Sequence, residues 1–257
     1  MSAEVTIVIP NWNTGDLMRV CLASLLRYTR HPYRILVVDN ASDDASRETL
    51  EAAAKLDLIQ LVTREDPKHD GAPEHAAALD LGVELSETPY VFTLDSDAWA
   101  RREGWLSRWV AGLAGGASHV GARKFPGGRV KRFFQWARGE ERPPEANYVR
   151  PCHALYRTAL LKTYGLSFAP YQGLEGRWRT TGERVHELLL ARGHQPTFLP
   201  HAEVEELVGH IRHATMVMNA PTFPGLRRKT RLKGELQIGG LLASREAREL
   251  LEGSPIR

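Results

Sequence analysis

The stretch ILVVDNASDD, residues 35–44, decides the fold class. Residues 35–38 are apolar at every position, which is typical of a central parallel strand that is covered on both faces. Residues 39–44 then supply side chains that favour a turn and cap a helix, so we expect a helix over roughly residues 45–56. A buried strand that leads at once into a helix is the repeating unit of a parallel α/β sheet.

The same alternation extends in both directions from this stretch. Further strands are expected at residues 5–9, 58–62, 90–94 and 119–122, and further helices at 15–31, 73–85, 105–113, 183–192 and 244–251. Residues 123–150 are basic, aromatic and punctuated by Gly and Pro, which predicts a long loop. The sequence therefore predicts an α/β protein whose regular part lies before residue 100.

The composition excludes several classes of protein. The chain has 257 residues, of which 42% are hydrophobic and 25% charged, so it can bury a large core, and no apolar stretch is long enough to span a membrane. Nothing before residue 5 resembles a secretory signal, which favours a cytoplasmic protein. Cys21 and Cys152 lack C-x-x-C spacing and are expected to be buried thiols. The 34 basic residues nearly balance the 31 acidic ones, at a net charge of +3, so the overall charge does not by itself indicate nucleic-acid binding.

Polar residues follow each of the first strands, at the edge of the sheet where ligands of open α/β proteins bind. They are residues 10–13 after the first strand, 39–40 after the second, 63–66 after the third and 95–97 after the fourth. No glycine-rich phosphate loop is among them, so glycine amides are not expected to grip a dinucleotide. Carboxylates repel a diphosphate unless a divalent cation lies between them, and Asp95-Ser96-Asp97 can offer oxygens to Mg²⁺ or Mn²⁺.

Several motifs, in order, resemble the family 2 glycosyltransferases of the GT-A fold. They are PNWN at residues 10–13, VVDNASDD at 37–44, AALDLG at 77–82, LDSD at 94–97, GWL at 104–106 and HIRHAT at 210–215. The resemblance covers residues 4–122 well and 150–215 loosely. It implies a Rossmann-like, mostly parallel central sheet flanked by helices, in a single domain with a C-terminal helical extension. Residues 1–100 would then bind the nucleotide sugar, 101–215 would bind the acceptor and carry catalysis, and 216–257 would form the basic extension.

The resemblance also implies roles for individual residues. The base and ribose of a nucleotide sugar would be held by a set that includes Asp39, which would accept from a base N–H. The other members of this nucleotide-binding set are Pro10, Asn11, Trp12, Asn13, Arg64, Asp95 and Ser96. Asp95 would lie beside both ribose and metal, Asp97 would bind Mn²⁺ or Mg²⁺ directly, and His210 would be a later metal ligand, with His213 as second choice.

The catalytic base is where the sequence departs from the family. The family has a Glu-Asp pair at the start of a helix that ends in glycine, and counting back from Gly193 places this pair on Thr181-Gly182. The nearest carboxylates are Glu183 and Glu175. Glu183 is the first choice, because a carboxylate at a helix N-terminus stays ionised.

The resemblance implies an inverting transferase that moves a sugar from a nucleoside diphosphate to the hydroxyl of an unidentified saccharide, lipid-linked or other acceptor. The missing Glu-Asp pair keeps open a protein that binds nucleotide sugars without catalysis. A third alternative is binding of single-stranded nucleic acid by the basic aromatic segment 123–136, which is not expected. The basic run Arg227, Arg228, Lys229, Arg231 and Lys233 is either solvated or touches an anionic surface at the inner face of a membrane.

Overall fold

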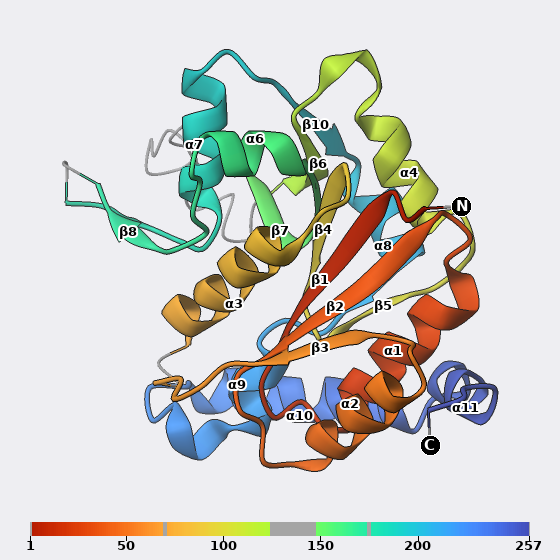
Figure 1. Ribbon diagram of the computed structural model, residues 1–257. Coiled ribbons are helices and arrows are strands. Elements are labelled where there is room, and N and C mark those ends of the chain that lie inside the picture. The colour runs from red at the N-terminus through yellow and green to blue at the C-terminus, as the bar shows by residue number, and fades with distance from the viewer. Residues whose placement is uncertain (1, 69–70, 124–147, 174–175, 257) are drawn as a thin grey trace.

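A computed structural model of the protein describes residues 2–68, 71–123, 148–173 and 176–256 (Figure 1). Its centre is a seven-stranded sheet. In spatial order the strands are β10 (Pro196–Leu199), β6 (His119–Arg123), β7 (Val149–Arg157), β4 (Tyr90–Leu94), β1 (Val5–Asn11), β2 (Tyr33–Asp39) and β3 (Gln60–Thr63). All neighbours are parallel except that β7 runs antiparallel to both β4 and β6. The expected mostly parallel sheet is confirmed.

Helices cover both faces of this sheet (Figure 1). They are α1 (Asp16–Tyr28), α2 (Ala45–Lys55) and α4 (Trp105–Gly112) on one face, and α3 (Ala72–Leu85), α6 (Thr158–Thr163) and α7 (Glu183–Ala191) on the other. β1 is buried at every position, as two-sided cover requires. Gly82 lets α3 approach this strand closely, because a Cβ on Gly82 would lie 2.2 Å from a methyl of Val8.

A second, two-stranded sheet and further helices follow the central sheet. β5 (Ala98–Ala100) follows β4 and pairs antiparallel with β11 (Val208–His210), which comes directly after α8 (His201–Leu207). Next come α9 (Ala214–Met218), α10 (Arg228–Leu242) and α11 (Arg245–Glu252). Four shorter pieces complete the list: the strands β8 (Tyr171–Gln172) and β9 (Trp178–Arg179) and the 3-10 turns η1 (Ala114–Gly116) and η3 (Ala220–Thr222).

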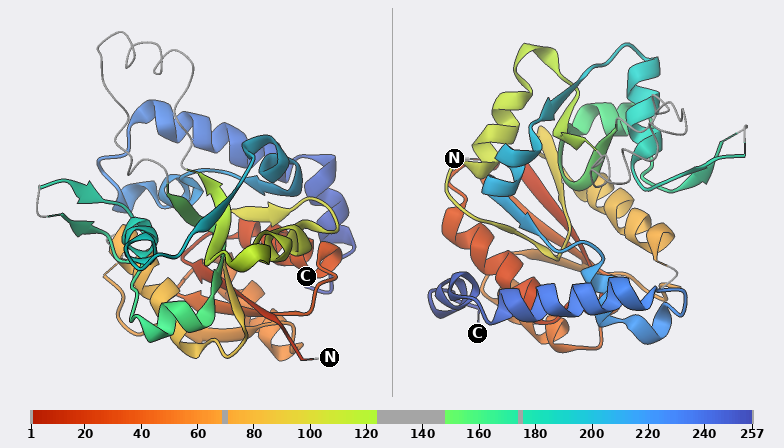
Figure 2. Two further views of the ribbon diagram at one scale, coloured as in Figure 1. Left: turned by 90° about the horizontal axis from the view of Figure 1, so that it is seen from above. Right: turned by 180° about the vertical axis from the view of Figure 1, so that it is seen from behind.

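The C-terminal helices pack against α1 (Figure 2). A third apolar cluster joins them, with Leu17 and Val20 from α1 meeting Leu241 of α10 and Leu250 of α11. The helices α10 and α11 are therefore packed onto α1 rather than trailing from the fold.

Two elements differ from the sequence expectation. Residues 149–157 form the strand β7, which begins inside the loop expected at residues 123–150. Residues 124–147 of that loop lie outside the described residues. The basic run at 227–233 forms the N-cap and first turns of a separate helix, α10, ahead of the final helix α11. Cys21 and Cys152 are both buried and free, as expected. Among the described residues, no helix is long and apolar enough to cross a membrane.

A buried histidine pair links β6 to α7 away from the pocket. His119 is fully buried, its Nδ1 lies 2.8 Å from the Ser118 hydroxyl, and its Nε2 lies 2.7 Å from Nδ1 of His186. Burial and the charge of His186 lower the pKa of His119 to about 3. The folded protein therefore keeps His119 neutral at pH values where an unfolded chain protonates it.

We expect this pair to make the protein sensitive to acid. The unfolded pKa of histidine is about 6.5, so the stabilisation is fully present above that pH and is lost as the pH falls from about 6.5 toward 3. The contribution lost between pH 7 and pH 5 is about 2 kcal/mol. Urea unfolding at both pH values measures it, and His119→Gln should flatten the pH dependence. An equal pH dependence in wild type and variant would contradict this origin.

Candidate active site

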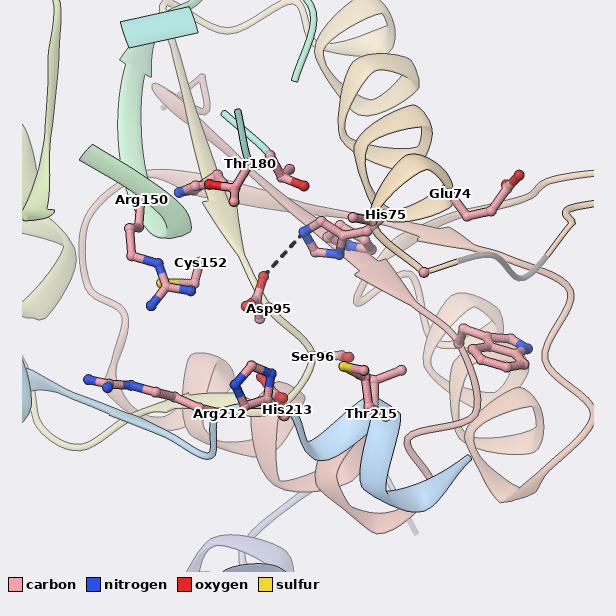
Figure 3. Close-up of a pocket in the computed structure, with 18 of the residues that line it drawn as sticks. Glu74, His75, Asp95, Ser96, Arg150, Cys152, Thr180, Arg212, His213 and Thr215 are labelled. Carbon is pink, nitrogen blue, oxygen red and sulfur yellow. Dashed lines mark ion pairs between the residues drawn. The ribbon is translucent and has the colours of Figure 1, made fainter. Parts of the chain in front are cut away.

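A cavity of about 410 Å³ opens at the carboxyl ends of β1 and β4. Its walls come from residues 10–12 after β1, 95–97 after β4, the N-terminus of α3, the start of β7, residues 180–181 before α7, and the segment around α9. Figure 3 shows His75 of α3 pointing across the pocket toward Asp95, with Arg150 and Cys152 of β7 on the other side of that carboxylate. This cavity thus lies at the sheet edge that the sequence singled out.

Asp95, Asp97 and His210 converge on the pocket floor. The backbone turns tightly between β4 and β5, with the Ala98 N–H donating to the Asp95 carbonyl at 3.0 Å, and the β5–β11 pairing sets His210 opposite Ala98. His210 Nε2 lies 3.2 Å from Asp97 Oδ1 and 3.5 Å from Asp95 Oδ2. Residues more than a hundred positions apart in sequence are therefore brought together by one short two-stranded sheet.

The charges on this floor stabilise one another against burial. Burial alone would raise the pKa of Asp95, but a hydrogen bond from His210 and the positive charges of His75, His210 and Arg150 hold it below its usual range. Burial would lower the pKa of His210, but Asp97 and Asp95 raise it well above its usual value. A bound metal ion would compete with a proton for His210, because the neutral imidazole is the ligand.

These three side chains fit a divalent cation. Their ligand atoms all lie within 4.8 Å of one another. Asp97 is buried; its Oδ2 accepts a hydrogen bond from the Ala214 N–H at 3.2 Å, and its Oδ1 faces His210 Nε2 in the ion pair. Two carboxylates with one imidazole suit Mn²⁺ better than Mg²⁺, which prefers an all-oxygen shell. The metal role of these residues stays a prediction that the geometry accommodates.

Five of the predicted nucleotide-binding residues line the pocket: Pro10, Asn11, Trp12, Asp95 and Ser96. Trp12 stands edge-on to Phe223, with ring centroids 6.0 Å apart, and Phe223 lines the pocket as well. His213, the second choice for a metal ligand, also lies in the wall.

Three other predicted residues support the pocket from behind its wall. Asp39 is buried and accepts hydrogen bonds from Asn11 Nδ2 at 2.8 Å and from the Ser42 hydroxyl at 2.6 Å, so it fixes the end of β1 to the end of β2. It faces a separate cavity of about 200 Å³. Its predicted contact with a base N–H is untested, and it would require Asp39 to share these hydrogen bonds.

Asn13 and Arg64 also act as braces. Asn13 Nδ2 donates to Asp43 Oδ1 at 2.6 Å, and the Asp43 N–H donates back to Asn13 Oδ1 at 2.9 Å. Arg64 Nη1 donates to Asn40 Oδ1 at 2.8 Å and to Glu74 Oε2 at 2.6 Å, which ties the end of β3 to α3. Neither side chain is part of the main pocket wall.

Glu183 lies beside the pocket but not in its wall. It is 1% exposed, Arg177 donates a hydrogen bond to its Oε1, and the Thr180 N–H donates to its Oε2 at 3.0 Å. Thr180 and Thr181 line the pocket instead, and Thr181 is the first of the two positions, Thr181 and Gly182, on which the count from Gly193 places the family's acidic pair. The position of Glu183 does not favour the predicted role of base, and Glu175 lies outside the described residues.

Residues that sequence reasoning missed complete the site. His75 Nε2 lies 3.5 Å from Asp95 Oδ1, and Arg150, Cys152 and Arg212 line the pocket. Burial would raise the pKa of the Cys152 thiol, but His153 and His210 lower it to about 5. Arg212 could have been found, because it lies inside the quoted HIRHAT motif, whereas Arg150 and Cys152 reach the site only through the pairing of β7 with β4.

The sequence matches the family model described as Glycosyl transferase family 2 over residues 6–165. Glycosyltransferase GlyG of Streptococcus pneumoniae is 31% identical over 97 residues, which cover 38% of this chain and 31% of GlyG. Poly(ribitol-phosphate) beta-glucosyltransferase of Bacillus spizizenii is 32% identical over 108 residues, which cover 41% of this chain and 16% of that protein. The chain thus spans less than half the length of these relatives.

Solved structures share the fold at low sequence identity. Mannosyltransferase PcManGT of Pyrobaculum calidifontis, in complex with GDP-Man and Mn²⁺, superposes with a TM-score of 0.59 and 17% identity, over 98% of this chain and 73% of that one. S. aureus TarS 1-349 with UDP-GlcNAc gives a TM-score of 0.52 and 15% identity, over 98% and 78%. This likeness establishes the GT-A architecture. Since the family model covers more than half of the sequence, the chain belongs to glycosyl transferase family 2.

Proposed function

We propose that this protein transfers a sugar from a nucleoside diphosphate to an acceptor hydroxyl, with inversion at the anomeric carbon and with help from a divalent cation. The observation that carries the proposal is the convergence of Asp95, Asp97 and His210 on the floor of the cavity of about 410 Å³, beside residues 10–12. A diphosphate needs positive charge among carboxylates, and a nucleoside needs an apolar and amide-lined wall. Both are available in one pocket.

The residues of the chain divide the work in this proposal. Residues 10–12 bind the nucleoside against Phe223, and Asp95 lies where the ribose meets the diphosphate. Asp97 and His210 hold the cation, which when bound neutralises charge that develops on the departing diphosphate. Arg150 and Arg212 line the same pocket and add positive charge near the phosphates. Inversion follows if the acceptor oxygen attacks from the face opposite the diphosphate in a single step.

Solved relatives support this assignment of ligands. PcManGT was solved with GDP-Man and Mn²⁺ and TarS with UDP-GlcNAc. Glucosyl-3-phosphoglycerate synthase of Mycobacterium tuberculosis, which superposes with a TM-score of 0.53, was solved with Mn²⁺, UDP and phosphoglyceric acid. We propose the same ligand classes for this chain: a nucleoside diphosphate sugar and Mn²⁺ or Mg²⁺.

The experiment that tests the function separates an enzyme from a mere binder. The protein is incubated with Mn²⁺ and a panel of nucleotide sugars, and both the melting temperature and the release of nucleoside diphosphate are measured. We expect a nucleotide sugar to raise the melting temperature in the presence of Mn²⁺ and to release diphosphate, with both effects lost in chelator. A thermal shift without release under all acceptor conditions would favour a nucleotide-sugar-binding protein. If no donor raises the melting temperature and none releases diphosphate, the proposal is contradicted.

We also propose that α10 contacts an anionic membrane surface, where a lipid-linked acceptor would be found. Arg227 precedes the helix, and Arg228, Lys229, Arg231 and Lys233 lie in its first turns. Leu232 and Leu236, which share one face of α10, are 49% and 77% exposed. Basic and apolar side chains together on an exposed helix are the features of a surface that binds the lipid interface.

Vesicle co-sedimentation tests this contact. Each basic residue near an anionic surface contributes about 1 kcal/mol, so Lys229→Glu with Lys233→Glu should weaken binding to anionic vesicles by about thirtyfold. The matched control is Arg184→Glu with Arg192→Glu, at exposed positions in α7 and directly after it, which makes the same change in net charge. Equal loss in both double variants would mean that net charge alone governs binding, and no binding by wild type would remove the proposal.

A further inference from the structure

A second set of potential metal ligands lies beside the carboxylate set. Cys152 Sγ and ring nitrogens of His153 and His210 all lie within 4.8 Å of one another. Cys152 and His210 line both the main pocket and a smaller adjoining cavity of about 70 Å³, which His153 also lines. The two cavities thus meet at Cys152 and His210.

His153 gives an independent indication that a ligand belongs there. Its side chain is more than nine-tenths buried at 9% exposure, and its Nδ1 makes no hydrogen bond to any described residue. The ring stands edge-on to that of His210, with centroids 5.9 Å apart, and its backbone carbonyl accepts from Trp109 Nε1 at 3.2 Å. The position of His153 is therefore fixed, while a buried nitrogen that normally requires a partner has none among the described groups.

We propose that Cys152, His153 and His210 form a site for a thiophilic divalent cation of the Zn²⁺ class, distinct from the Asp95–Asp97 pair and sharing His210 with it. One sulfur and two imidazole nitrogens are ligands that Zn²⁺ and Co²⁺ bind in preference to Mg²⁺. Ligand atoms around a tetrahedral Zn²⁺ are about 3.3–3.8 Å apart, so small side-chain rotations from the present separations bring the three onto one ion. The fourth position remains open to water from the cavity.

The sharing of His210 has a functional consequence that rests on the proposed function. If an ion is bound by Cys152, His153 and His210, His210 is no longer available to a second ion at Asp95 and Asp97. Mn²⁺ would then be bound by these two carboxylates alone. Zn²⁺ should therefore compete with Mn²⁺-dependent nucleotide binding rather than replace Mn²⁺.

Titration of the purified full chain with Co²⁺ tests the site without any activity assay. Wild type should develop the near-ultraviolet charge-transfer band of a sulfur–cobalt bond, and Cys152→Ser should lack it. Cys21→Ala is the matched control, because Cys21 is a buried free thiol outside both ligand sets, and it should keep the band. Asp97→Asn should also keep the band, since Asp97 is not in the sulfur-containing set.

The outcomes separate this inference from the proposed function. No band in wild type, or an undiminished band in Cys152→Ser, overturns the sulfur site. Loss of the band in Asp97→Asn means one mixed site in place of two sets and also overturns the proposal. Donor turnover with Mn²⁺ is measured separately, so a protein that transfers sugar but shows no sulfur–cobalt band keeps the function and loses only this inference.

Discussion

Replacing Asp97 with Asn should abolish Mn²⁺-dependent nucleotide binding and lower sugar transfer by about 10²–10³-fold, because a bound cation contributes several kcal/mol of charge stabilisation in the transition state. The amide keeps the shape of the side chain, and its oxygen can still accept the hydrogen bond that the Ala214 N–H donates to Asp97 Oδ2 in the wild type. Because Asp97 is buried and its Oδ1 lies 3.2 Å from His210 Nε2, the loss of its charge should also lower the stability of the fold. Isothermal titration with a nucleoside diphosphate and Mn²⁺ measures the first effect and calorimetric melting the second.

Asp16→Asn is the control for this experiment. It makes the same chemical change at an exposed position on α1 and should leave both binding and turnover as in wild type. If Asp97→Asn still shows a melting temperature that rises with Mn²⁺ and nucleotide as much as in wild type, Asp97 is not the ligand. His210 with Asp95 would then have to hold the cation.

The second large effect concerns the base, where two glutamates are expected to behave differently. The Glu183 carboxylate is fully engaged by Arg177 and Thr180, with Arg179 Nε at 3.9 Å, so Glu183→Gln should act mainly on stability. Removing one partner of a buried ion pair leaves the other charge uncompensated, and the expected cost is about 3 kcal/mol, or roughly 10 °C in melting temperature. Calorimetry measures this loss.

Glu175→Gln is the matched variant for turnover. With Glu183 engaged elsewhere, Glu175 is the remaining sequence candidate for the group that takes the acceptor proton, and losing a general base costs about 10²–10⁴ in rate. Because the base acts on the transition state, nucleotide affinity should not change. If Glu183→Gln instead loses turnover without losing stability, Glu183 is the base after all. If both variants transfer sugar normally, another carboxylate or an acidic acceptor is used.

The parallel half of the fold could be predicted from sequence because its strands are buried on both faces. The expected strand 90–94 coincides with β4, and the strand expected at 35–38 lies inside β2. β7 was not predicted, since its sequence VRPCHALYR mixes charge, Pro and apolar residues. Pro151 is tolerated there because pairing with β4 begins only at His153 and a register shift in β6 spares the position.

The helix α10 was missed for a similar physical reason. Its glycines and charges give no amphipathic pattern, yet Gly234 is needed where the helix meets α9, since a Cβ there would lie 2.5 Å from a methyl of Val217. Packing against a specific neighbour thus overrode a weak local signal.

The residues of the candidate site also divide into those that the sequence pattern reveals and those that only the tertiary structure reveals. The carboxylates at the ends of β2 and β4 are visible in the sequence, because each follows an apolar strand directly. His75, Arg150 and Cys152 enter the site from α3 and from an antiparallel strand, so only the tertiary pairing reveals them. Family order brought His210 into consideration, and the β5–β11 ladder shows how it reaches Asp97.

The contribution of the C-terminal segment to the pocket wall has a thermodynamic consequence. Met216 and Phe223 line the cavity, and the same segment leads into helices that rest on α1. If the proposed donor binds in this cavity, its contacts with Met216 and Phe223 favour the docked state of residues 216–256, and by reciprocity any force that pulls α10 away weakens donor affinity by the same factor. A membrane that engages α10 could thus tune how tightly this protein holds its donor without touching the pocket itself.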